Sequence, residues 1–153
     1  MSRAPYWLPS MRWGARLNDT TAIDALVAAV TDPFDGVHMG ITAETVARKW
    51  GISRQDQDEL AVESHRRAMS AIESGKFRAQ IVPIEQKSKN GPVMFMSDEQ
   101  PRSDATLENL ARLKPAFDPE GTVTAGNASS LNDGAAAVVL MERSAAAARG
   151  LKP

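Results

Sequence analysis

Small and polar residues gather in one stretch of this sequence, residues 122–134. All of them except Val123 and Leu131 are Gly, Ala, Ser, Thr, Asn or Asp. This composition lets a ligand approach the backbone closely and offers amides and hydroxyls for hydrogen bonds. Loops next to buried strands often carry function, and this stretch leads into an apolar segment. We treat it as a candidate ligand loop, although the residues alone favour a tight turn whose Asn and Ser side chains satisfy their own backbone.

Two other places carry residues suited to ligand contact. His38 and Met39 lie between a turn and a helix start, where both can line a pocket for a thioether or acyl-chain ligand. Arg102 precedes another helix start, where a guanidinium and helix amides can contact phosphate, although most surface arginines do not. Ala116 and Phe117 can form a pocket wall or plain packing. The histidines and carboxylates have no spacing that assembles a metal site or a histidine-based triad.

Length and composition limit the number of domains, the partners and the chemistry that this chain can have. Its 153 residues suffice for one domain, and 42% hydrophobic against 24% charged residues argue against a largely disordered chain. The 18 Lys and Arg against 19 Asp and Glu leave a net charge of -1, so we expect no nucleic acid or membrane partner. The absence of cysteine excludes disulfides and a cysteine nucleophile in this chain. No targeting or spanning segment is recognisable, and we expect a cytoplasmic location.

Apolar spacing predicts three helices around the candidate residues. The first covers residues 19–33, with a cap at its first or second residue and a proline at its end. The second runs from 42 to 50 and is closed by Gly51. A short helix capped near Asp104 follows the arginine.

The clearest helix is predicted for residues 53–75. Ser53 and Asp56 have the spacing of a capping box, and Gly75 can end the helix. The apolar side of this helix includes His65 at its buried edge. We therefore interpret His65 as a structural rather than a catalytic histidine.

The first 18 residues have no helical period and carry Tyr6, Trp7 and Trp13 beside three arginines. We expect an irregular arm. Exposed aromatic residues next to arginine are typical of subunit contacts, and a loop packed on its own domain is the equal alternative.

Two kinds of strand are predicted later in the chain. Residues 81–85 and 93–96 flank a polar turn, as in a hairpin. Residues 135–141 are apolar on both faces, which is typical of a strand inside a sheet that is covered on two sides. The rest of the chain offers mainly short helices, so we expect the neighbours of this strand to lie outside the sequence.

The order of these pieces resembles the middle third of thiolases, the acetyl-CoA acetyltransferases and 3-ketoacyl-CoA thiolases. The resemblance extends over essentially the whole sequence, and its specificity comes from the ordered set of matches. The matching segments are residues 1–6, 13–16, 38–40, 42–44, 53–58, 64–68, 113–117, 121–129 and 131–136.

The resemblance implies an α/β fold of five layers, α/β/α/β/α, with two similar halves and a loop domain inserted in the first. Residues 1–130 are then the α+β loop domain, with an oligomerisation arm at 1–18. Residues 131–143 are the last strand of the N-terminal half, and 144–153 begin the link to the C-terminal half. The chain is accordingly expected to be a fragment that contributes one strand to a larger layered sheet.

The chemistry implied by the resemblance is Claisen condensation of two acyl-CoA molecules or the reverse thiolytic cleavage of a 3-ketoacyl-CoA. Covalent catalysis by a cysteine splits this exchange into two steps. The family's catalytic Cys, His and second Cys match no residue of this chain, so we assign no catalytic residue and expect the chain alone to be inactive. Coenzyme A thioesters are implied as substrates, with no further cofactor and no metal.

The resemblance also implies which residues hold coenzyme A. Arg102 is expected to contact the nucleotide end, and Ser129 to hydrogen-bond the pantetheine arm. The tunnel for this arm is expected to be lined by His38, Met39, Ala116, Phe117, Ala125, Ala128 and Leu131. A homotetramer or other homo-oligomer and a role in fatty acid metabolism are implied for the full-length parent.

One position departs from the family pattern, because Ser130 stands where thiolases usually have Gly. If the backbone there needs positive φ or a close approach to the ligand, the side chain is expected to strain it by about 1 kcal/mol or more. Two alternatives to the thiolase fragment remain: a noncatalytic module for coenzyme A binding or oligomerisation, and a truncated product without function that aggregates through its unpaired strand.

Overall fold

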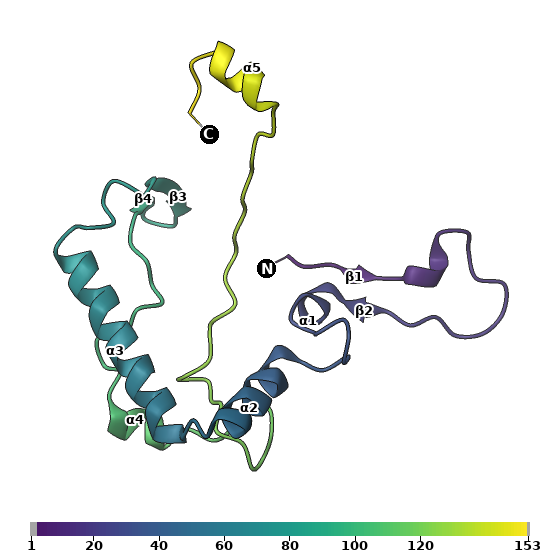
Figure 1. Ribbon diagram of the computed structural model, residues 1–153, viewed down its shortest axis with the longest axis horizontal. Coiled ribbons are helices and arrows are strands. Elements are labelled where there is room, and N and C mark those ends of the chain that lie inside the picture. Colours follow the sequence, from purple (N-terminus) through teal and green to yellow (C-terminus); the bar gives the residue numbers. More distant parts are fainter. Residues whose placement is uncertain (1–2, 153) are drawn as a thin grey trace.

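Short elements joined by long connections make up the chain, and the computed structural model describes residues 3–152. Two longer helices meet at an angle, and the chain's other parts extend away from them (Figure 1). The elements are β1 (Tyr6–Trp7), the 3-10 helix η1 (Pro9–Met11), β2 (Ile23–Asp24), α1 (Ala25–Ala29), α2 (Met39–Trp50), α3 (Arg54–Glu73), β3 (Ile84–Ser88), β4 (Gly91–Phe95), α4 (Leu107–Ala111) and α5 (Arg143–Ala148).

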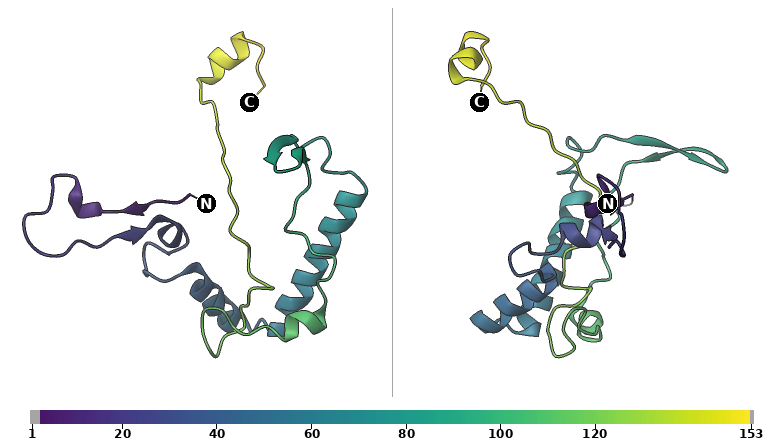
Figure 2. Two further views of the ribbon diagram at one scale, coloured as in Figure 1. Left: turned by 180° about the vertical axis from the view of Figure 1, so that it is seen from behind. Right: turned by 90° about the vertical axis from the view of Figure 1, so that its right-hand side faces the viewer.

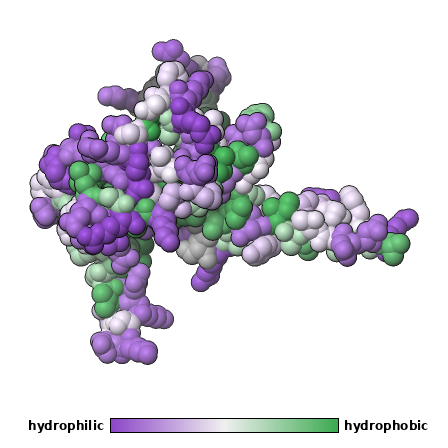
Figure 3. All heavy atoms as spheres, turned by 90° about the horizontal axis from the view of Figure 1, so that it is seen from below, coloured by the Kyte–Doolittle hydropathy of each residue, from purple (hydrophilic) through white to green (hydrophobic). Residues whose placement is uncertain are grey.

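The central body consists of α2, α3, α4 and the loop at residues 112–130, which passes beneath the junction of α2 and α3 in Figure 1. Few side chains are buried in it. Among the described residues the buried apolar ones are Ala25, Ala47, Leu110, Val123 and Ala146, and the buried polar ones are Glu44, Asp58 and Thr124. Apolar residues instead lie in scattered patches on the surface, as Figure 3 shows for one face. Hydrogen bonds, several of them between residues far apart in the sequence, therefore contribute much to holding this body together.

Helix α2 begins earlier than predicted, at Met39 instead of residue 42. The His38 side chain accepts a hydrogen bond from the Gly40 amide, and this cap starts the helix one turn sooner. The predicted end is confirmed. Gly51 follows Trp50 in the left-handed conformation, with φ of 64°.

The predicted capping box of α3 is confirmed. Ser53 Oγ accepts from the Asp56 amide at 3.1 Å, and Asp56 Oδ2 accepts from the Ser53 amide at 2.9 Å. The helix runs to Glu73, and Gly75 follows with φ of 70°. The short helix α4, predicted to be capped near Asp104, begins at Leu107 because Thr106 provides its cap.

The predicted helix at 19–33 is wrong in its first part. β2 pairs with β1 in antiparallel register, with Trp7 opposite Ile23, so the backbone at Ile23 is extended. Asp24 then accepts from the amides of Leu26 and Val27 and starts a helix of five residues, α1. The arm at 1–18 is accordingly not wholly irregular, since it contains β1 and η1 within its described part.

The predicted hairpin is confirmed in kind, but its first strand lies closer to the C-terminus than predicted and its second strand begins closer to the N-terminus. β3 and β4 pair from Ile84 opposite Phe95 to Ser88 opposite Gly91, which leaves a turn of two residues between them. Gly91 has φ of 109°, a conformation that favours glycine and sets the pairing next to it. The hairpin projects away from the helices, as the right-hand view of Figure 2 shows.

Residues 135–141 are extended and unpaired. They run along the long connection that leads to α5, away from the helices (Figures 1 and 2). Val138, Val139 and Leu140 are 81%, 87% and 89% exposed. No strand within residues 3–152 pairs with them, so the part of the chain that the structure describes does not provide the sheet that their composition predicts. In the same part, no helix combines the length and the apolar character needed to cross a bilayer.

We predict that Ser53→Ala lowers the free energy of unfolding by about 1 kcal/mol, since the first turn of α3 loses its cap. Urea unfolding followed by far-UV circular dichroism measures this difference. The matched control is Ser70→Ala, at an exposed position inside the same helix, where we expect a change within about 0.5 kcal/mol. Equal effects at the two serines would contradict the role of the capping box.

Candidate functional site

A large cavity lies between α2 and the loop at 122–131. Its volume is about 890 Å³, within the range typical of ligand pockets, and its wall is mostly apolar. Six of the nine residues predicted to hold a ligand line it: His38, Met39, Phe117, Ala128, Ser129 and Leu131. The structure therefore brings together residues that are far apart in the sequence.

A second cavity of about 680 Å³ lies on the other side of the same loop, against α3 and α4. Arg102 and Ala125 line it, together with Ala128. Ala128 and Ser130 line both cavities, so the two spaces adjoin along the loop. Ala116 lines neither of them. The backbone amide of Ala116 donates to the Val123 carbonyl at 2.9 Å, and a ligand-lining role for Ala116 stays a prediction.

One edge of the first cavity is an aromatic pair. The rings of His38 and Phe117 are stacked, with centroids 4.7 Å apart and planes inclined by 27°. Gly40 makes this approach possible, because a Cβ at that position would overlap the Phe117 ring. The pair joins the start of α2 to the segment before the loop.

Glu44 fixes the first residues of the loop. Its carboxylate is buried, with 3% of the residue exposed, and accepts from the amides of Thr122 and Val123 and from the Thr122 hydroxyl, at 2.7 to 3.1 Å. Burial by itself raises the pKa of Glu44. The hydrogen bonds from Thr122 and Val123 outweigh it, so that the pKa lies below its ordinary value. The carboxylate thus binds the loop as an anion.

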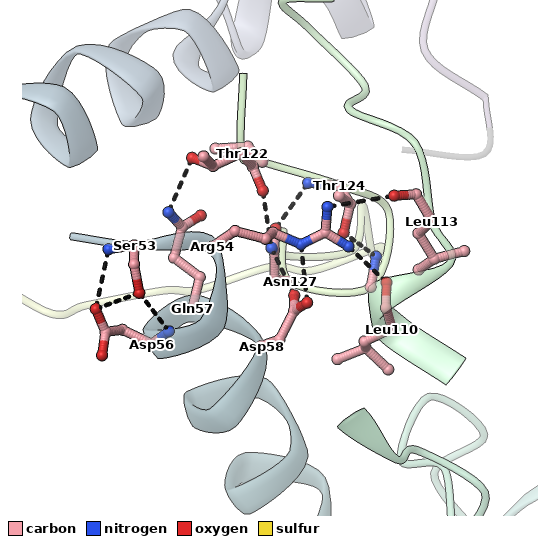
Figure 4. Close-up of polar contacts among 12 residues, drawn as sticks. Ser53, Arg54, Asp56, Gln57, Asp58, Leu110, Leu113, Thr122, Thr124 and Asn127 are labelled. Carbon is pink, nitrogen blue, oxygen red and sulfur yellow. Dashed lines mark hydrogen bonds and ion pairs between the residues drawn. The ribbon is translucent and has the colours of Figure 1, made fainter. Parts of the chain in front are cut away.

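Asp58 fixes the middle of the loop. It is 3% exposed and accepts from Asn127 Nδ2 at 2.9 Å and from Arg54 Nε at 2.8 Å (Figure 4). Arg54 also donates to the carbonyl oxygens of Leu110 and Leu113. This ion pair, in which Asp58 is buried and Arg54 is half-buried, therefore connects the loop, α3 and the end of α4.

Asn127 completes this network within the loop. Its Oδ1 accepts from the Thr124 amide at 2.7 Å, and its Nδ2 also donates to the Thr122 carbonyl at 3.1 Å. Figure 4 shows these contacts together with the bond from Gln57 to the Thr122 hydroxyl. The prediction that Asn side chains of this loop bond the loop's own backbone is thus confirmed for Asn127. Ser129 differs, because its side chain lines the cavity and makes no hydrogen bond with the other described residues.

Arg102 lies at the edge of the second cavity and is paired with Asp104. Its Nε and Nη2 donate to the two carboxylate oxygens at 2.9 and 2.8 Å, and both side chains are largely exposed. This hydrogen bonding raises the pKa of Arg102 and lowers that of Asp104. The backbone amide of Arg102 donates to His65 Nδ1 at 3.2 Å, which agrees with a structural role for His65.

Ser130 does not adopt the positive φ that would strain its backbone. Asn18 is the one residue other than glycine with positive φ in the described part of the chain, so Ser130 has an ordinary backbone conformation. Its hydroxyl accepts from Asn132 Nδ2 at 3.0 Å. Positive φ, one of the two conditions for the expected strain, is therefore not met, and strain from a close approach of the ligand stays a prediction.

Sequence reasoning missed the two carboxylates that hold the loop. Acidic residues on helices usually face solvent, and nothing in their type sets Glu44 and Asp58 apart. A spacing signal existed for Glu44. Gly40, Glu44 and Ala47 recur at intervals of four and three and form the buried side of α2. A carboxylate between two small residues on such a side has to be paired.

Comparisons with known proteins agree on one family. Residues 1–144 match the family model described as thiolase, N-terminal domain. The chain is 56% identical over 154 residues to beta-ketothiolase BktB of Cupriavidus necator and 50% identical over 153 residues to an acetyl-CoA acetyltransferase of Pseudomonas aeruginosa. These matches cover 100% and 99% of this chain. The chain spans 39% of the length of each of these relatives.

Solved structures give the same result. The acetyl-CoA acetyltransferase of Bacillus anthracis superposes with a TM-score of 0.76 at 49% identity, covering 97% of this chain and 38% of that one. Human mitochondrial 3-ketoacyl-CoA thiolase superposes with a TM-score of 0.76 at 40% identity, covering 85% of this chain and 33% of that one. The backbone arrangement is therefore that of a part of these α/β proteins.

We predict that Glu44→Gln frees the loop from α2, because a neutral amide accepts more weakly and brings its own donors toward the Thr122 and Val123 amides. The expected cost is about 1 to 3 kcal/mol in the free energy of unfolding. Hydrogen exchange should show faster exchange at these two amides. Glu73→Gln, an exposed carboxylate at the end of α3, is the control and should leave them unchanged.

The same carboxylate makes stability depend on pH. The pKa of Glu44 is lower in the folded chain than in the unfolded chain. Its carboxylate therefore contributes fully to the free energy of unfolding above the unfolded-state pKa, about 4.3, and this contribution is lost as the pH falls through the lower folded-state pKa. Urea unfolding across this acidic range should therefore show a smaller pH dependence for Glu44→Gln. Identical pH profiles for the variant and the original chain would contradict the proposed role of ionised Glu44 in holding the loop.

Proposed function

The chain belongs to the thiolase family, and from that premise we propose that it carries the coenzyme A-binding loop portion of a thiolase-type acyl-CoA acyltransferase. The reaction is Claisen condensation of two acyl-CoA molecules or thiolytic cleavage of a 3-ketoacyl-CoA. The observation that supports this most directly is the pair of adjoining cavities on the two sides of the loop at 122–130. One is mostly apolar and the other carries an arginine at its edge.

The first cavity suits the pantetheine arm, which is a long, flexible chain with few polar groups. Met39 and Leu131 supply apolar wall, and Ser129 supplies a hydroxyl with no partner among the described residues. A hydroxyl in such a position can donate to or accept from an amide of the arm. The role of Ser129 in this proposal is to fix the arm against the loop.

The second cavity suits the nucleotide end of the same ligand. Arg102 is 66% exposed and keeps guanidinium donors beyond the two that bind Asp104. Phosphate oxygens are natural partners for these donors. A ligand that extends from Ser129 to Arg102 would pass Ala128 and Ser130, which line both cavities.

The chain has no cysteine, and so it has no thiol to accept an acyl group. We infer that it does not turn over acyl-CoA by itself and that catalysis needs a polypeptide with the catalytic cysteine. The exposed aromatic residues of the N-terminal arm, Trp7 and Trp13, support oligomer formation in the protein to which it belongs, proposed here as a cytoplasmic homotetramer of fatty acid metabolism. The same arm and the missing thiol favour a second candidate function, a noncatalytic module for coenzyme A binding or oligomerisation.

The purified chain is predicted to give no cleavage of acetoacetyl-CoA above a blank without protein. The physical reason is the missing nucleophile, so added coenzyme A should not change the result. The acetyl-CoA acetyltransferase of Pseudomonas aeruginosa, assayed in parallel, serves as the positive control. Turnover by the chain alone would contradict the assignment of catalysis to another polypeptide.

Coenzyme A binding is predicted and can be measured by titration calorimetry. Ser129→Ala should weaken binding of both coenzyme A and pantetheine by about fivefold, the loss expected for one neutral hydrogen bond. Arg102→Ala should weaken the binding of coenzyme A by about tenfold and leave the affinity for pantetheine unchanged. Arg149→Ala, at an exposed position after α5, removes one positive charge elsewhere and is the matched control, with unchanged affinity for both ligands expected. Absence of coenzyme A binding by the original chain would contradict the proposed function.

A further inference from the structure

The β3–β4 hairpin has an apolar side that nothing covers. It projects away from the helices (Figure 2), and all residues of both strands are exposed except Gly91, which is half-buried. Because side chains alternate along a strand, Ile84, Val93 and Phe95 lie on the same side of the hairpin. A hairpin of two strands is marginally stable in water, and additional strands beside an apolar face stabilise it. The hairpin therefore has the character of a sheet that lacks further strands.

The register determines which backbone groups of β3 are free to pair with another strand. The turn of two residues joins Ser88 to Gly91, and such a turn closes on a hydrogen-bonded pair. Hydrogen-bonded and non-hydrogen-bonded pairs alternate along an antiparallel ladder. The next pair, Lys87 opposite Pro92, therefore directs its backbone groups away from the hairpin, and Glu85 is placed in the same way two residues earlier. The outer edge of β3 thus offers the N–H and C=O groups of Glu85 and Lys87.

The outer edge of β4 is less suited to pairing. Pro92 lies at an outward position and has no N–H, so this edge lacks a donor there. Proline on an edge strand is one of the ways in which natural sheets prevent further pairing. β3 contains no proline. An additional strand therefore fits beside β3 and not beside β4.

We propose that β3 pairs with β3 of a second copy of this chain, in antiparallel orientation and centred on Gln86. In this register Glu85 lies opposite Lys87 of the second copy, and Lys87 lies opposite its Glu85. Both cross-strand pairs are attractive. The same residues carry the outward backbone groups, so the contact adds about four hydrogen bonds between the copies. The product is a sheet of four strands, and its formation does not depend on coenzyme A binding.

Charge selects this register over its neighbours. A twofold axis at Glu85 would set two carboxylates opposite each other, and an axis at Lys87 would set two ammonium groups opposite each other. Like charges directly opposite in a sheet are destabilising. The axis at Gln86 avoids both contacts. It also keeps the apolar sides of the two hairpins on one side of the four-stranded sheet, because a twofold axis perpendicular to a sheet does not exchange its faces.

A single introduced cysteine tests the pairing, since the chain has no cysteine of its own. Gln86→Cys places two thiols in a non-hydrogen-bonded pair with Cα atoms about 4.5 Å apart, within the range that a disulfide spans. In a glutathione redox buffer the full chain should form a disulfide-linked dimer, resolved by nonreducing electrophoresis. Met94→Cys, at an exposed position on β4, is the matched control and should stay monomeric. Equal dimer yields at the two positions, or no dimer at position 86, would overturn the proposal.

Charge exchange tests the register in the same Gln86→Cys chain. Lys87→Glu sets carboxylates opposite each other in both pairs and should lower the dimerisation constant by about tenfold. Addition of Glu85→Lys restores opposite charges in reversed order and should restore the dimer. Far-UV circular dichroism of the reduced variants should match that of the original chain. A dimer that ignores Lys87→Glu, or that the double exchange does not restore, would overturn the inference.

Discussion

The arrangement of the site depends on two buried carboxylates. Glu44 and Asp58 are each 3% exposed, and a buried charge is costly unless hydrogen bonds or an opposite charge compensate it. Glu44 is compensated by amides of the loop, and Asp58 by Arg54 and Asn127. If the loop left α2, Glu44 would lose all of its hydrogen-bond donors, and if it left α3, Asp58 would lose the Asn127 amide and keep Arg54. Because the loop separates the two cavities, these contacts also set the shape of the site.

Local signals in the sequence were sufficient for several elements. The capping box at Ser53 and the left-handed Gly51 act within one turn, and both were predicted at the correct residues. The candidate loop was recognised from its composition. The six residues that line the first cavity, three of them in this loop, were predicted from the resemblance to thiolases. The start of α2 and the extended backbone at Ile23 were missed, because a histidine cap and a pairing with β1 depend on side-chain geometry and on a distant strand. The carboxylate contacts were missed for the same reason, since Glu44 and Thr122 meet only in the folded chain.

The apolar segment at 135–141 and the small buried core indicate how much this body depends on polar contacts. Val139 and Leu140 are almost fully exposed, and Ala47, Leu110 and Val123 are the apolar residues buried at the centre. A body with so little apolar burial gains little from the hydrophobic effect. The relatives are more than twice as long as this chain, and the exposed segment fits an environment that such longer proteins can supply.

The central claim is that the loop at 122–130, held by Glu44 and Asp58, forms a common wall of one extended coenzyme A site. Chemical-shift mapping on the nitrogen-labelled chain tests it most directly. Titrated coenzyme A should shift amides at the start of α2, along 122–131 and around Arg102, and leave the β3–β4 hairpin and α5 unchanged. Shifts confined to the hairpin or the N-terminal arm, or no shifts at all, would contradict the account.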